Sequence, residues 1–225
     1  MATASNNSRA PVQADPRPMT PEERSVIFAS SLGTVFEWYD FYLFGVMSAI
    51  IAANFFTALD PATRDIFTLL AFAAGFAVRP FGAIVFGRLG DLVGRKYTFL
   101  VTILIMGLST FLVAFLPTYK SWGIAAPITL IALRLLQGLA LGGEYGGAAT
   151  YVAEHAPHGK RGAYTAWIQT TATVGLMLAL MVILGTRLYM GEKEFNEWGW
   201  RVPYAVSGLL LAVSVWIRLK LSESP

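Results

Sequence analysis

Six long stretches of this 225-residue sequence hold very few charged residues, and they constrain the fold more than any other feature. Each is about as long as the ~20 residues with which a helix crosses the hydrocarbon of a bilayer, or somewhat longer. None alternates between apolar and polar residues as the strands of a membrane barrel do. The sequence therefore predicts an all-α membrane protein with six transmembrane helices. The predicted spans are residues 25–53, 66–88, 98–116, 126–153, 163–187 and 202–219.

Composition agrees with lipid as the main solvent. Charged residues make up 14% of the chain and apolar residues 55%, whereas about a quarter of a typical soluble domain is charged. There is no cysteine, and the two histidines are His155 and His158. No phosphate-binding loop, Ser/His/Asp set or metal-ligand spacing is present, so we expect neither an enzyme nor a metal or cofactor. The net charge of +3 fits basic membrane loops better than nucleic-acid binding.

The ends and loops of the chain predict its orientation. Residues 1–19 are polar and proline-rich, which is typical of a disordered tail, and residues 20–225 form the predicted helix bundle. Ten lysines and arginines fall on the side of both termini, against five on the other side. Because basic loops stay cytoplasmic, both termini and the tail are predicted to be cytoplasmic.

Five ionisable residues lie inside the predicted spans, where each costs at least ~2.5–3.5 kcal/mol unless it faces protein or water. They are Glu37, Asp40, Arg79, Arg134 and Glu144. Counted by helical rise, Asp40 lies ~24 Å and Arg134 ~30 Å from the inner side, so an arginine side chain can bridge them. Glu37 and Glu144 share another depth with Arg79. The alternative for Arg79 is a position near a helix end, with its side chain reaching the headgroups.

Three acids and two bases leave one carboxylate unmatched, and an unmatched buried carboxylate has the raised pKa that proton coupling requires. On the fourth span, Arg134, Gln137 and Glu144 share one face, which we expect to line a cavity. Gly138, Gly142 and Gly146 form a ridge on another face, which favours close packing against a neighbouring helix. The predicted substrate and proton pathway is therefore Glu37, Asp40, Arg79, Arg134, Gln137 and Glu144.

A motif between the second and third spans resembles the G-x-x-x-D-R-x-G-R-R/K signature of the major facilitator superfamily. It reads Gly87-Arg-Leu-Gly-Asp91-Leu-Val-Gly94-Arg95-Lys96, with Leu92 in place of the usual basic residue. The strings Phe36-Glu-Trp-Tyr-Asp-Phe41 and Val78-Arg-Pro-Phe-Gly82 are similar to the metabolite:proton symporter branch of that superfamily. The ending Glu223-Ser-Pro225 also resembles a signal of the superfamily. Members of the branch carry organic acids or zwitterions such as proline and betaine.

This resemblance implies twelve spans in two halves, each half built as a 3+3 inverted repeat, with substrate held between the halves. The chain corresponds to the N-terminal six-helix half, so a C-terminal half is an expected partner, along with the bilayer, protons and a small organic substrate. The resemblance also implies location in a bacterial inner membrane and a cytoplasmic gate. The gate residues are Gly87, Asp91, Gly94, Arg95, Lys96, Glu154, Arg161 and Glu223. The alternative for the basic ones is that they only fix topology.

The function that these patterns favour is proton-coupled symport of a small organic metabolite. Arg134 favours a carboxylate, although its pairing with Asp40 can equally neutralise it. Two interpretations remain for a group of aromatic residues. They could form a box that binds a quaternary amine, or they could simply pack beside the cavity. The residues are Trp38, Tyr39, Tyr42 and Tyr145. The alternatives are a non-transporting six-helix fragment, a half-transporter that needs a partner half, or a channel that needs no proton gradient.

Overall fold

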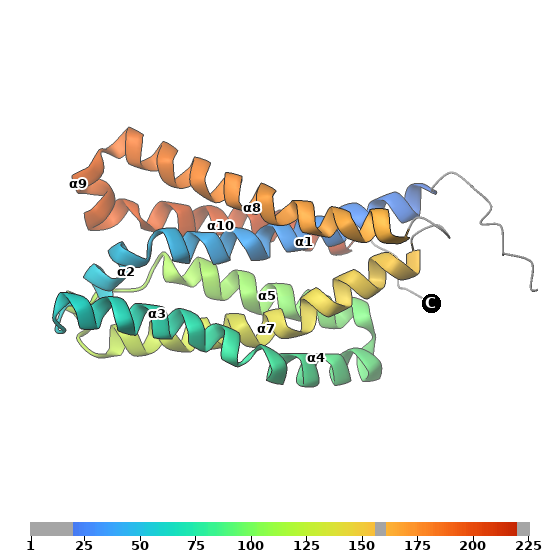
Figure 1. Cartoon of the computed structure of the whole chain (residues 1–225), viewed down its shortest axis with the longest axis horizontal. Helices are drawn as coiled ribbons and strands as arrows, with labels where there is room; N and C mark the ends of the chain where they lie inside the picture. The colour runs from blue at the N-terminus through green and yellow to red at the C-terminus, as the bar shows by residue number, and fades with distance from the viewer. Residues whose placement is uncertain (1–19, 156–160, 220–225) are drawn as a thin grey trace, which may run out of the picture.

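The computed structural model describes residues 20–155 and 161–219, and nearly all of these residues are helical (Figure 1). The long helices run along one common axis and form a bundle, and the described residues contain no strand. The tail predicted for residues 1–19 lies outside this range. In chain order the helices are α1 (Pro21–Val46), α2 (Ser48–Phe55), α3 (Pro61–Ala77), α4 (Arg79–Val93), α5 (Arg95–Val113), α6 (Tyr119–Trp122), α7 (Ala125–His155), α8 (Arg161–Met190), α9 (Glu192–Glu194), the π-helical turn η1 (Phe195–Gly199) and α10 (Arg201–Leu219).

The long helices alternate in direction along the bundle. The start of α1, the α4–α5 junction, the end of α7 and the end of α10 lie at one end, and α2 and α9 lie at the other (Figure 1). Gly94 makes the α4–α5 turn with a φ of 105°, a conformation that favours glycine because it has no Cβ. The end that holds these turns is the one predicted to be cytoplasmic. Its placement relative to a membrane stays a prediction.

Three continuous helical stretches are long and apolar enough to cross a membrane: Pro61–Val93, Ala125–Gly142 and Gln169–Met190. A fourth is counted if Ser31–Val46 and Ser48–Phe55 act together as one span. Tyr97–Val113 and Arg201–Trp216 are apolar but shorter. These statements cover only the residues that the structure describes, and the number of six spans stays a prediction.

The first predicted span, residues 25–53, is broken: α1 and α2 meet at Met47 with a bend of 64°. The sequence predicts one helical span here and does not predict this bend. The bend turns Ile51 and Phe55 of α2 inward, where both side chains are fully buried. Phe55 meets Trp200 edge to face, with ring centroids 5.7 Å apart. The bend therefore lets α2 pack across the end of the bundle.

The boundary between α3 and α4 lies at Val78, within the continuous helical stretch Pro61–Val93. Pro80 follows within the first turn of α4, and proline has no backbone N–H to continue the hydrogen bonds of α3. At its other end α3 begins after Asp60, which accepts hydrogen bonds from the Thr63 hydroxyl at 2.7 Å and backbone N–H at 3.1 Å. These bonds hold the pKa of the exposed Asp60 carboxyl below its usual range.

Glycines let α7 pack directly on the backbone of α3 and α4. A Cβ on Gly138 would overlap the carbonyl oxygen of Gly75, and one on Gly142 would overlap that of Arg79. From the other side, a Cβ on Gly82 would overlap the carbonyl of Leu139. The predicted glycine ridge is thus a packing face at its first two positions. The surroundings of Gly146 lie outside the described side chains.

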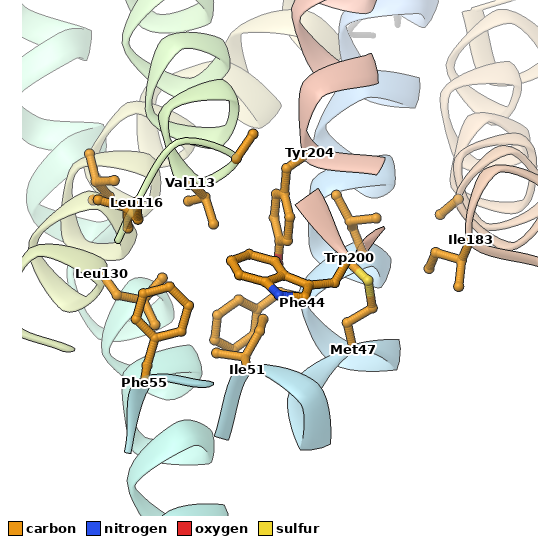
Figure 2. Close-up of a cluster of buried hydrophobic side chains, with 14 of the residues drawn as sticks. Phe44, Met47, Ile51, Phe55, Val113, Leu116, Leu130, Ile183, Trp200 and Tyr204 are labelled. Carbon is orange, nitrogen blue, oxygen red and sulfur yellow. The ribbon is translucent and has the colours of Figure 1, made fainter. Parts of the chain in front are cut away.

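A cluster of large apolar side chains fills the bundle toward the end that α2 covers (Figure 2). Phe44 of α1 and Trp200 beside α10 are fully buried in it, and Val113 and Leu130 add contacts from α5 and α7. Many other large apolar side chains point outward, such as Leu69 on α3 and Met181 on α8, which are 58% and 62% exposed. Such an apolar surface suits lipid or another helix bundle, not water.

We expect Gly138→Ala to lower the free energy of unfolding by about 1–3 kcal/mol, because the new methyl group would push α3 away from α7. The thermal unfolding midpoint of the protein in detergent measures this. Gly185→Ala on α8 is the matched control, because a Cβ there meets no atom within 4 Å. Equal midpoints for the two variants would contradict the backbone contact between α3 and α7.

Candidate functional site

The centre of the bundle holds a buried ion pair between α1 and α7. Arg134 donates a hydrogen bond from Nη1 to Oδ2 of Asp40 at 3.0 Å. The exposed fractions of the two side chains are 5% and 4%. The guanidinium also lies over the ring of Phe44, with its Cζ 4.0 Å from the centroid. The two residues that helical rise placed at bridging depths are therefore in direct contact.

This pair leaves part of its hydrogen-bonding capacity unused. Oδ1 of Asp40 and Nε of Arg134 are buried and have no hydrogen-bond partner in the structure. A buried polar atom without a partner costs about 1–3 kcal/mol, and more when it is charged. Such an arrangement is typical of a site where the protonation or pairing of the charges changes during function.

A second, looser pair joins α1 to the start of α4. Nη1 of Arg79 lies 3.9 Å from Oε1 of Glu37. The Glu37 side chain is 5% exposed and the Arg79 side chain is 31% exposed. Arg79 lies near the middle of the continuous stretch Pro61–Val93, and its position relative to the headgroups stays a prediction. Glu144, the second acid predicted at this depth, has its side chain outside the described set.

Gln137 lies one turn beyond Arg134 and connects α7 to α5. Its Nε2 donates to the hydroxyl of Thr110 at 2.9 Å, and that hydroxyl donates to the carbonyl of Met106 at 2.9 Å. Its Oε1 is buried without a hydrogen-bond partner. Gln137 is therefore anchored on one side and has an acceptor available on the other.

A pocket opens between α1, α3, α4 and α7, and three of the charged residues predicted inside the spans border it: Asp40, Arg79 and Arg134. The pocket and the space at its open mouth together have a volume of about 310 Å³. Its lining residues are Asp40, Phe41, Phe72, Gly75, Phe76, Arg79, Arg134, Gln137, Gly138 and Leu141. Four of the predicted pathway residues thus share one pocket: Asp40, Arg79, Arg134 and Gln137. Glu37, which pairs with Arg79, is not among the lining residues.

Sequence reasoning missed the aromatic side of this pocket. Phe72 and Phe76 lie four residues apart on α3 and so share a face, and Phe41 of α1 meets both rings at centroid distances of 5.1 and 5.5 Å. The four-residue spacing was the available signal, but it is equally common on lipid-facing surfaces.

The aromatic box predicted from Trp38, Tyr39, Tyr42 and Tyr145 does not include Tyr39 in the structure. The hydroxyl of Tyr39 donates to the carbonyl of Pro203 at 2.7 Å, and its side chain is fully buried against α10, away from the pocket. Trp38 and Tyr42 stack on each other at 5.8 Å. Tyr145 lies outside the described side chains.

The predicted gate is described only in part. Gly87 and Asp91 lie exposed on α4, and Gly94 forms the turn into α5. The side chains of the other five gate residues lie outside the described set. They are Arg95, Lys96, Glu154, Arg161 and Glu223. Their gating role stays a prediction.

Comparisons with known proteins match almost the whole chain. Residues 26–225 match the family model described as sugar (and other) transporter. A proline/betaine transporter of Salmonella typhimurium is 38% identical over 202 residues, which cover 90% of this chain and 40% of that protein. The alpha-ketoglutarate permease of Escherichia coli is 38% identical over 216 residues, covering 95% of this chain and 50% of the permease.

The fold also has a solved counterpart. The partially occluded, inward-open xylose transporter XylE of E. coli superposes with a TM-score of 0.81 at 17% identity, covering 91% of this chain and 51% of that one. At this identity the likeness concerns the fold alone. The chain spans about half the length of the curated relatives and of the solved structure that it matches.

A double-mutant cycle tests the buried pair. We expect Asp40→Asn and Arg134→Gln each to lower stability by about 3–5 kcal/mol, because each leaves an uncompensated charge in low dielectric. The double variant should lose less than the sum, which unfolding midpoints of all four proteins in detergent will measure. Strict additivity would mean that the two side chains do not interact.

Proposed function

Because the chain belongs to the sugar (and other) transporter family of the major facilitator superfamily, we propose that its whole protein is a proton-coupled symporter. It carries a small organic metabolite across the bacterial inner membrane by alternating access. The buried Asp40–Arg134 pair supports this proposal most directly. The coupling ion is the proton, and no other cofactor is proposed.

The physical logic of coupling lies in the charge of Asp40. When Asp40 is ionised it holds Arg134, and when it is protonated the guanidinium loses its counter-charge and must find another partner. Proton binding thus changes the relative stability of two arrangements of α1 and α7. A transporter that rocks between two open states can use this difference to move a proton and a substrate together.

We propose a carboxylate as the substrate class. Two arginines border the pocket, and guanidinium groups bind carboxylates with paired hydrogen bonds. Proline, betaine and alpha-ketoglutarate, after which two of the relatives are named, all possess a carboxylate.

The proposal concerns the whole protein, since these residues span about half of the relatives' length. A second six-helix half is the proposed partner, and it would close the open side of the pocket. The alternative is that the 225 residues function as a half-transporter that pairs with another half, or as a fragment that does not transport. The eight predicted gate residues are proposed to close the cytoplasmic end.

Uptake measurements test the proposal. Vesicles that contain the whole protein should accumulate a labelled carboxylate when a proton gradient is imposed, and a protonophore should abolish this accumulation. Asp40→Asn should abolish accumulation, because its neutral side chain can neither gain nor lose the coupling proton. Asp65→Asn, an exposed acid on α3, is the control and should behave as the wild type. Undiminished proton-driven uptake by Asp40→Asn would refute the assigned role of the pair.

Reporter fusions test the proposed topology. Fusions after Lys96 and His158 should report the cytoplasm, and fusions after Asp60, Lys120 and Lys193 should report the periplasm, because the basic loops stay inside. If two fusions on either side of a predicted span reported the opposite locations, the six-span arrangement would be wrong.

A further inference from the structure

We propose that Arg79, and not Arg134, binds the carboxylate of the transported metabolite. This inference rests on the proposed function, and it separates the two arginines of the pocket by role. Arg134 would hold the coupling carboxylate of Asp40, and Arg79 would hold the carboxylate that is carried.

The two arginines differ in how firmly they are paired. Arg134 contacts Asp40 at 3.0 Å, and both side chains are almost completely buried. Arg79 lies 3.9 Å from Glu37, close to the limit of an ion pair, and 31% of its side chain is exposed. Arg134 also has donors without a partner, Nε and Nη2, but its charge is already neutralised by Asp40 and its side chain is buried. A loosely paired and more open guanidinium is easier for a charged ligand to reach and keeps more of its charge for that ligand. Binding a ligand carboxylate therefore costs less free energy at Arg79 than at Arg134.

The guanidinium of Arg79 is also held in a defined place. Its Cζ lies 4.2 Å from the ring centroid of Phe76, and a cation over an aromatic face is attracted to it. Its backbone carbonyl lies directly against Gly142 of α7, which holds this part of the chain next to that helix. Nε of Arg79 is buried and has no hydrogen-bond partner in the structure. A pre-positioned guanidinium with unused donors suits a carboxylate ligand.

The rest of the pocket indicates what the ligand carries beside its carboxylate. Phe41, Phe72 and Phe76 form one aromatic group, with the Phe72 and Phe76 centroids 5.2 Å apart. These rings suit an apolar body or an onium group, which binds to aromatic faces. The inferred ligand class is a compact carboxylate with an apolar or onium body.

Equilibrium binding to the purified whole protein tests this inference without a proton gradient. The probes are labelled proline and glycine betaine, displaced by unlabelled proline, prolinamide, glycine betaine and its amide. The wild type should bind at least one carboxylate more tightly than the matched amide. Arg79→Gln should weaken carboxylate binding by about tenfold to a hundredfold and leave the amide nearly unchanged, which is the range for a hydrogen bond to a charged group.

Two further variants keep the result interpretable. Arg88→Gln removes an exposed arginine from the same helix outside the pocket, and it should retain the wild-type preference. Arg79→Lys keeps the charge but loses the planar two-pronged donor, so its preference should fall by a smaller factor. If Arg79→Gln is not monodisperse, Arg79→Lys provides the test.

The outcomes separate this inference from the proposed function. An unchanged preference in Arg79→Gln, or in Arg79→Lys where that variant is the test, would overturn the assignment. A wild type that binds no carboxylate better than its amide would overturn it as well. If the wild type shows the preference but vesicles show no proton-driven uptake, symport fails while the role of Arg79 stands.

Discussion

The cost of removing charge from water is the constraint on which this structure depends. Asp40 and Arg134 lie at the centre of an apolar bundle, where each provides the counter-charge of the other. Their contact at 3.0 Å therefore ties α1 to α7 at one depth and one rotation. Once these two helices are set, the residues that follow at helical spacing, such as Gln137, face defined neighbours.

The apolar core and the charged pair share a residue. Phe44 belongs to the cluster that also contains Trp200 (Figure 2), and the guanidinium of Arg134 lies over the Phe44 ring. Phe72 stacks on Phe44 at 5.6 Å and also borders the pocket. Aromatic side chains suit this boundary, because they pack like other apolar groups and still attract a cation. Phe44 and Phe72 thus connect the apolar core at one end of the bundle to the pocket.

Much of this arrangement could be predicted from the sequence, because lipid allows few alternatives. The apolar stretches fall in the long helices, helical rise brought Asp40 opposite Arg134, and the glycine spacing on α7 indicated a packing face. The bend at Met47 was missed, because it depends on how Ile51 and Phe55 pack across the bundle. The pocket wall of Phe41, Phe72 and Phe76 was also missed, since helical periodicity alone does not tell a lipid-facing phenylalanine from one that faces a pocket.

The glycine contact between α7 and the α3–α4 pair has a mechanical consequence. Because Gly75, Gly138 and Gly142 bring backbone against backbone, no layer of side chains exists there to slide or change rotamers. The backbones of the helices that carry Arg79 and Arg134 are therefore in direct contact, which restricts how these helices can shift relative to each other. Both buried acids, Glu37 and Asp40, lie on α1, three residues apart. A movement of α1 relative to these helices would therefore change both ion pairs together.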